Sequence, residues 1–252
     1  MSLLTVERIK LFSTRSPYWC LVAIVVASAG FATLFGLAER GSGAIPYFAL
    51  RGVGLGMSIF MVLSALAVTT EYRFNTLKST FLAAPRRINV LLAKTLLLAA
   101  LGAVVGFVCA IGAFFLTKAL AKEPPAPLVL EGQIWRQVAG YAALFAIAAV
   151  ISVAVGTLLR QSAGAIALLL LWPLLIESLF TLIPTIGKKA GPWLPFAAGN
   201  KFITPTSVPL GGNFNGVLDT GGPTPVQGLL VFLATGVVLW LIAAAVLKRR
   251  DA

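Results

Sequence analysis

Long, uninterrupted runs of apolar residues dominate the sequence, and most charged residues fall between them. Each run is long enough to cross a bilayer as a helix that rises 1.5 Å per residue. The runs lack the alternation of apolar and polar residues that is typical of membrane-spanning strands. We therefore expect an all-α integral membrane protein with six transmembrane helices. They are predicted at Tyr18–Leu37, Phe48–Val68, Val90–Leu116, Val138–Leu159, Ala163–Ile183 and Val226–Leu247.

Composition supports lipid as the environment of these runs. Hydrophobic residues make up 59% of the 252 residues and charged residues only 11%, whereas about 25% of a soluble domain is charged. The two cysteines, Cys20 and Cys109, lie inside apolar runs and are interpreted as small apolar residues. We expect one membrane domain that spans residues 1–252, with no metal site.

The net charge of +12 raises the question of whether the chain binds nucleic acid. However, the basic residues lie at the ends of the apolar runs. Such a distribution is typical of topology signals, so no nucleic-acid partner is expected. With both termini in the cytoplasm, the short inner segments hold 12 of the 20 Lys and Arg residues. These are Arg8, Lys10, Arg15, Arg73, Lys78, Arg86, Arg87, Lys94, Arg160, Lys248, Arg249 and Arg250. Arg51 and Lys94, near span ends, are expected to extend toward the membrane surface.

Residues 1–16 are amphipathic. One face of this segment is apolar and includes Leu3, Leu4 and Ile9. The other is polar and includes Glu7 and Lys10. A basic amphipathic segment before a first span indicates a helix that lies in the membrane interface. The alternative is a loose cytosolic tail.

The segment 71–87, EYRFNTLKSTFLAAPRR, joins the second and third spans on the predicted inner side. Phe74, Leu77 and Phe81 recur at helical spacing, and Pro85 ends the predicted helix. Because anchors at such spacing suit a helix that docks into a groove, we favour a protein groove as their environment. The alternative is a connector that rests on the membrane surface.

The segment 184–226 is rich in Gly and Pro and is predicted to be extracellular. Trp193 and Phe196 are candidates for anchors at the outer interface. A loop of this length is usually either functional or disordered, and the sequence leaves both open.

Glu177 is the one acid inside a predicted span. Charge at membrane depth is costly and tends to face a bundle or a cavity. Two interpretations remain open: a group in the substrate path together with Trp172 and Pro173, or a structural tie, for instance to Arg51 or Lys188. Pro173 is expected to kink the fifth span.

Several of these segments resemble the permease subunit of ABC-2 type exporters. Residues 6–19, VERIKLFSTRSPYW, are similar to the elbow helix of that family, and residues 70–94, TEYRFNTLKSTFLAAPRRINVLLAK, resemble its coupling-helix segment. Glu177 and Leu194-Pro195-Phe196 resemble members with roles in drug efflux. The six-span layout fits the family over the whole chain.

This resemblance implies a subunit of a bacterial cell-membrane exporter that moves an apolar or amphipathic, drug-like or lipid-like substrate. The partners it implies are an ATP-binding cassette ATPase, which would bind ATP and Mg²⁺, and a second copy of this permease or a similar one. The coupling role would fall on Glu71, Arg73, Phe74, Leu77, Lys78 and Phe81. Independently, no G-x-x-x-x-G-K-[ST] stretch occurs in the sequence, so this chain has no phosphate-binding loop of its own and is expected not to be an enzyme.

Two other classes of function compete with this one. A secondary transporter or channel that acts alone would need ionisable or broken-helix sites near the midplane, and only Glu177 qualifies. An intramembrane enzyme is hard to build without histidine and with a single intramembrane acid.

Overall fold

The computed structural model describes residues 3–37, 46–74, 87–121, 128–205, 207–209, 215–217 and 221–250. Within these ranges the regular secondary structure is helical apart from two short antiparallel strands, β1 (Ser207–Pro209) and β2 (Asn215–Val217). The helical elements are α1 (Leu3–Phe12), α2 (Ser16–Gly36), α3 (Pro46–Ala49), α4 (Arg51–Arg73), α6 (Arg87–Leu120), α7 (Gly132–Leu159), α8 (Ser162–Leu171), the π-helical turn η1 (Trp172–Ile176), α9 (Glu177–Thr181), α10 (Ile186–Ala190), the 3-10 turn η2 (Gly191–Trp193), α11 (Pro195–Ile203) and α12 (Pro225–Arg250).

Six segments among the described residues are helical, long and apolar enough to cross a membrane, which confirms the predicted number of spans. Their mean hydropathies lie between 2.0 and 2.7. The chain is therefore a multi-pass membrane protein. The spans are Ser16–Gly36, Tyr47–Arg73, Ile88–Leu120, Gly132–Leu159, Ser162–Thr181 and Pro225–Arg249.

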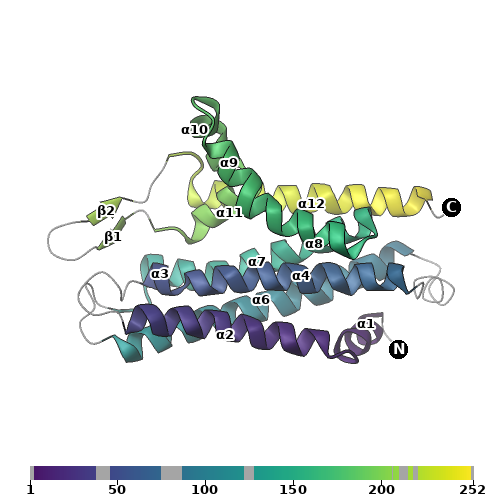
Figure 1. Cartoon of the computed structure of the whole chain (residues 1–252), viewed down its shortest axis with the longest axis horizontal. Coiled ribbons are helices and arrows are strands. Elements are labelled where there is room, and N and C mark those ends of the chain that lie inside the picture. Colours follow the sequence, from purple (N-terminus) through teal and green to yellow (C-terminus); the bar gives the residue numbers. More distant parts are fainter. Residues whose placement is uncertain are drawn as a thin grey trace.

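The spans run side by side, and both termini lie at the same end of the bundle (Figure 1). We call this the terminal end, and the opposite end, which carries β1 and β2, the loop end. α4 and α7 are the central helices, because 61% and 67% of their most apolar windows are buried. α2 and α6 pack beside them, α12 packs on α7, and α8 packs on α4 and α7.

Glycines allow the two longest helices, α6 and α7, to approach closely. A Cβ atom at Gly106 would lie 2.6 Å from the carbonyl oxygen of Tyr141, and one at Gly102 would lie 3.0 Å from that of Phe145. Small residues at helix interfaces therefore permit the backbone contact on which packing in lipid depends.

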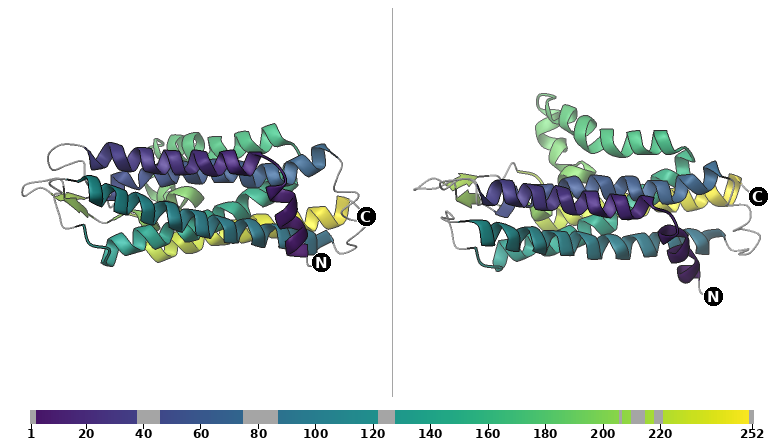
Figure 2. Two further views of the ribbon diagram at one scale, coloured as in Figure 1. Left: turned by 90° about the horizontal axis from the view of Figure 1, so that it is seen from below. Right: turned by 60° about the horizontal axis from the view of Figure 1, so that its bottom comes forward.

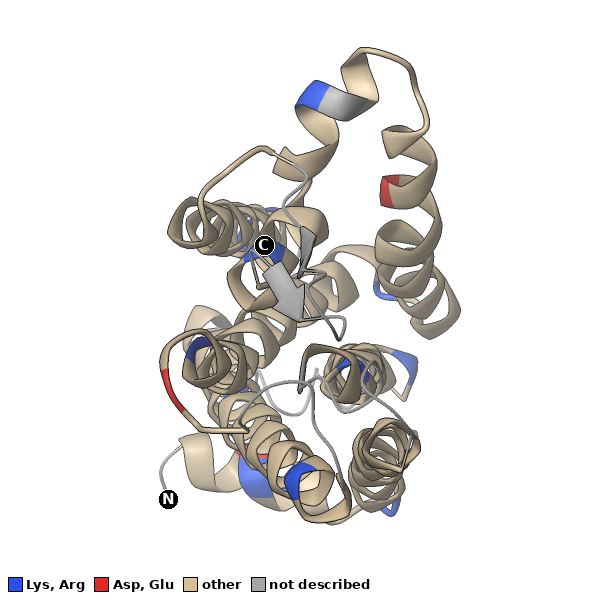
Figure 3. Cartoon of the chain, turned by 90° about the vertical axis from the view of Figure 1, so that its left-hand side faces the viewer, with Lys and Arg blue, Asp and Glu red and all other residues tan. Residues whose placement is uncertain are grey.

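The fifth span departs from the bundle. Figure 2 shows the segment α8–α9 standing away from the other spans along part of its length. Figure 3 gives a view along the long axis of the chain, in which its few charged residues are coloured. Only 17% of the most apolar window of this span is buried. Its large apolar side chains, such as Leu171, Leu174 and Leu179, are exposed, so this surface is left to lipid or to another membrane protein.

Two predictions about the chain outside the spans need correction. Glu7, assigned to the polar face of the N-terminal helix, is only 3% exposed. Phe196, assigned to the outer interface, is buried and packs on Phe232 with ring centroids 5.1 Å apart. In both cases a tertiary contact replaces the solvent or lipid that the local pattern predicts. Within the segment 184–226, α11 packs on α7 and α12.

Candidate functional site

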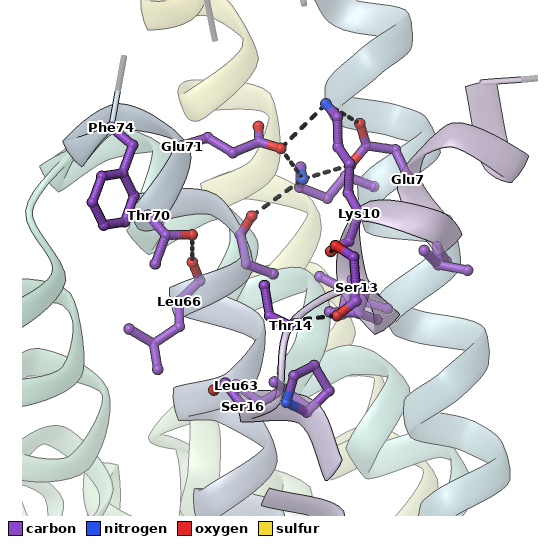
Figure 4. A pocket seen from close by; sticks show the side chains of 16 residues that line it. Glu7, Lys10, Ser13, Thr14, Ser16, Leu63, Leu66, Thr70, Glu71 and Phe74 are labelled. Atoms are coloured by element: carbon purple, nitrogen blue, oxygen red, sulfur yellow. Dashed lines mark hydrogen bonds and ion pairs between the residues drawn. The ribbon is translucent and has the colours of Figure 1, made fainter. Parts of the chain in front are cut away.

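Four charged side chains from three helices meet at the terminal end of the bundle. Glu7 and Lys10 come from α1, Glu71 from the last turn of α4, and Lys94 from the second turn of α6. Figure 4 shows Glu7, Lys10 and Glu71 pointing toward one another. We call these four residues the charge cluster. Because it holds two acids and two bases, its formal charge is zero.

Lys94 is the centre of the charge cluster. Its Nζ atom lies 2.5 Å from Glu7 Oε2 and 3.0 Å from Glu71 Oε1, and it donates to the carbonyl oxygen of Ala67 over 3.2 Å. An ammonium has three hydrogens to donate, and these three acceptors match them. The Lys94 side chain is 8% exposed. The expectation that Lys94 extends to the membrane surface is therefore wrong, because two carboxylates hold it inside.

Lys10 completes the charge cluster from its outer side. Its Nζ atom lies 3.1 Å from Glu7 Oε1 and 3.3 Å from Glu71 Oε1. Burial lowers the pKa of Lys10, but the neighbouring Glu71 and Glu7 carboxylates outweigh burial, so its pKa lies above the ordinary value of 10.5. Lys10 therefore stays charged at physiological pH and bridges α1 to α4.

The cluster joins chain segments that are far apart in sequence. Glu71 precedes, and Lys94 follows, the segment that connects α4 to α6. A buried charge is tolerated when it is paired and its remaining hydrogen-bonding capacity is used. The cluster meets this condition for Lys94 and thereby fixes α1 against the ends of α4 and α6.

The last turn of α4 is also held on its other side. The Arg160 guanidinium lies over the Tyr72 ring at 5.0 Å, and Ser162 donates a hydrogen bond to Thr69 over 2.9 Å. Arg160 joins α7 to α8 with a left-handed backbone, φ 54°. The end of α4 is therefore tied to α1, to α6 and to the turn between α7 and α8.

A pocket of about 410 Å³ lies next to the charge cluster. It is bounded by α1, the start of α2, α4 and the start of α6, and its walls are mostly apolar. Figure 4 shows Glu71 and Lys10 at one end of this pocket, and Leu63 and Ser16 at the other. We call it the α1 pocket.

Arg73 and Phe74 end α4 at the surface. Phe74 is 68% exposed, with the Arg73 guanidinium 5.7 Å from its ring centroid. The other predicted coupling residues, Leu77, Lys78 and Phe81, lie outside the described residues. The assignment of these side chains to an ATPase contact stays a prediction, as does that of Glu71, whose carboxylate faces Lys94 and Lys10.

Glu177 forms a second buried polar site, toward the loop end. Its Oε1 accepts hydrogen bonds from Trp172 Nε1 over 3.1 Å and from the Phe196 amide over 3.0 Å. Its Oε2 accepts from the Ala197 amide over 2.7 Å. These two amides belong to the first turn of α11, whose N-cap residue, Leu194, supplies no side-chain hydrogen bond. A carboxylate at this position satisfies unpaired donors and suits the positive end of the helix dipole. Arg51, one proposed partner of Glu177, instead contacts Tyr47.

Pro173 lies in the π-helical turn η1 that separates α8 from α9. Proline has no amide hydrogen and its ring crowds the preceding turn, and a widened turn accommodates both effects. The turn places Trp172 and Glu177 so that they hydrogen-bond to each other. The π-helical turn interrupts the regular α-helix at the position where the sequence predicts a kink.

Sequence reasoning missed the charge cluster, although it flagged Glu71 for a different role. The signal in the sequence was the position of charged residues at or inside apolar runs. Glu71 closely follows one apolar run and Lys94 lies inside the next, and a charge at such a position calls for a partner. Among the described residues, no group of three or more His, Cys, Asp or Glu residues is placed to hold a metal ion.

Comparison of the chain with protein-family models, with curated proteins and with solved structures gave no match.

Proposed function

We propose that this chain is the membrane-spanning permease subunit of an ATP-driven exporter, similar to the ABC-2 type, that moves an apolar or amphipathic substrate outward. A separate ATPase supplies the energy. The terminal end of the bundle faces the cytoplasm in this proposal, and residues 71–87 contact the ATPase.

The observation that carries the proposal is the anchoring of the last turn of α4. Glu71 is tied to α1 and α6, and Tyr72 to the turn before α8. The next residues, Arg73 and Phe74, are exposed at the point where the connecting segment begins. A force applied by a partner to this segment would reach several spans through fixed contacts, as a coupling element requires.

The fifth span supports the proposal in a second way. The exposed apolar side chains of α8, η1 and α9 offer a surface for a second permease copy. With two copies, a translocation path could form between subunits, so a single chain would need no large central cavity. Apolar spans with few polar groups suit an apolar or amphipathic cargo.

Co-purification tests the contact with the ATPase. The tagged chain, expressed in its native cell, should bring down an ATPase that carries a phosphate-binding loop. Phe74→Asp should reduce recovery at least about 30-fold, because truncating a central interface anchor costs about 2 kcal/mol or more. Phe81→Asp should do the same if the predicted helix is correct.

Leu37→Asp is the matched control. Leu37 is 61% exposed and follows α2 near the loop end, so it presents a similar apolar side chain on the opposite side of the membrane. This variant should retain the ATPase. If the Phe74→Asp and Phe81→Asp variants also retain the ATPase, the assignment of residues 71–87 to the ATPase contact is wrong. Transport by the purified chain alone in vesicles would instead support a stand-alone transporter or channel.

A further inference from the structure

The α1 pocket has the size and position of a ligand site. Its volume of about 410 Å³ falls in the range of about 300–1,000 Å³ that is usual for small-molecule sites. It lies at the terminal end of the spans, beside the amphipathic helix α1. At such a position a membrane-spanning chain meets lipid headgroups.

The walls of the α1 pocket change in character along its length. Leu63 and Leu66 line it along α4 toward the end that holds Ser16, and Leu97 and Leu98 line it along α6. Lys10, Ser13 and Thr70 line it nearer the end of α4 and along α1. A molecule that fills the pocket must therefore be apolar over most of its length and polar at one end. Membrane lipids have this amphipathic character and are present around the chain at high local concentration.

The exposed fractions of the four side chains in the charge cluster indicate which charge the polar end of a bound molecule should carry. The Lys10 side chain is 34% exposed, compared with 3% for Glu7, 8% for Lys94 and 11% for Glu71. Although the cluster is neutral as a whole, the Lys10 ammonium belongs to the most exposed of its four side chains, and Lys10 lines the pocket. A negatively charged headgroup therefore complements this end of the pocket better than a neutral one.

We propose that the α1 pocket binds one anionic phospholipid. One acyl chain lies along Leu66 and Leu97, whose side chains are partly exposed, and the phosphate lies beside Lys10. The lipid touches α1, α4 and α6 together, so it would fill the space beneath the amphipathic helix. This inference goes beyond the proposed function, because the binding needs neither an ATPase nor a transported substrate.

Native mass spectrometry of the purified full chain tests the proposal. The chain in mild detergent is titrated separately with phosphatidylglycerol, with phosphatidylethanolamine and with inorganic phosphate. We expect one phosphatidylglycerol to be retained about fivefold more tightly than phosphatidylethanolamine, which is the effect of one lysine near an anionic lipid surface. Inorganic phosphate should not bind measurably, because the acyl chain contributes most of the contact.

Two pairs of variants locate the site. Leu66→Trp fills the pocket and should reduce lipid retention at least tenfold. Leu55→Trp, the same change at a 46% exposed position on the same helix, should leave retention unchanged. Lys10→Met should remove the preference for phosphatidylglycerol, whereas Arg8→Met, at an exposed position on α1, should preserve most of it.

Three results would overturn the proposal. Equal retention by Leu66→Trp and Leu55→Trp would place the lipid elsewhere on the chain. Equal binding of the two lipids by the unmodified chain would refute the anionic headgroup. Tight binding of inorganic phosphate that displaces the lipid would identify a phosphate site instead. Loss of the ATPase in co-purification affects none of these outcomes, so failure of the proposed function remains distinguishable.

Discussion

Within the part of the chain that the structure describes, carboxylates are buried or nearly buried at two places, and they are stabilised in different ways. Glu7 and Glu71 at the terminal end are held by the ammonium groups of Lys94 and Lys10. Glu177 is held by two backbone amides and one indole. The first arrangement depends on side chains from three helices. The second depends mainly on the backbone of one short helix, which side-chain substitutions other than proline leave in place.

This difference predicts unequal sensitivity to substitution. Removing one ion of a buried pair leaves the other ion without compensation, whereas removing a capping carboxylate leaves neutral amides unpaired. A lone buried charge costs more than an unpaired amide. The charge cluster should therefore be the more fragile of the two sites, and its loss should affect several helices at once.

The largest effect is expected for Lys94→Met. Glu7 and Glu71 would then remain buried without their central partner, at a cost of about 3–5 kcal/mol in the free energy of unfolding. Denaturant or thermal unfolding in detergent measures this loss. Lys118→Met, at an exposed position on the same helix, is the matched control and should change stability by less than about 0.5 kcal/mol.

A double-mutant cycle sharpens the first prediction. Glu7→Gln combined with Lys94→Met removes both ions of the shortest pair, so the combined loss should be clearly smaller than the sum of the two single losses. Simple additivity would mean that the two side chains do not interact in the folded chain.

An intermediate effect is expected for Glu177→Gln. The amide oxygen can still accept from the first turn of α11, but the charge that suits the helix dipole is lost, so stability should fall by about 0.5–2 kcal/mol. Hydrogen exchange should quicken at the Phe196 and Ala197 amides and change little in α4. Lost transport with unchanged exchange and assembly would instead favour a role of Glu177 in the substrate path.

The smallest effect is the pH dependence contributed by Lys10. Its pKa is raised in the folded chain, so its stabilising contribution is complete below the unfolded value of about 10.5 and is lost as the pH rises through the folded value. The stability difference between the unmodified chain and Lys10→Met should be constant from pH 7 to 9 and should shrink above about pH 10.5. A difference that grows above this pH would contradict the assigned ion pairs.

The spans and the polar sites differ in how far the sequence predicts them. Continuous apolar runs gave the six spans to within a few residues in most cases, although the fourth span begins at Gly132 rather than at Val138. The interruption at Pro173 followed from the chemistry of proline. Glu177 was recognised as a residue of interest from its position in an apolar run, but its partners were not, because the Phe196 and Ala197 amides belong to a helix 19 and 20 residues further along the chain.

By itself, the sequence determined that this chain crosses a membrane as six helices, because burial of apolar residues in lipid depends on local composition and length. Only the tertiary structure decided which charges are paired. Glu7 and Lys94 lie on helices separated by two spans, and nothing in either local pattern indicates that they meet. Ion pairing acts over a few ångströms in space and takes no account of distance along the chain, so the packing of the helices had to place these partners together.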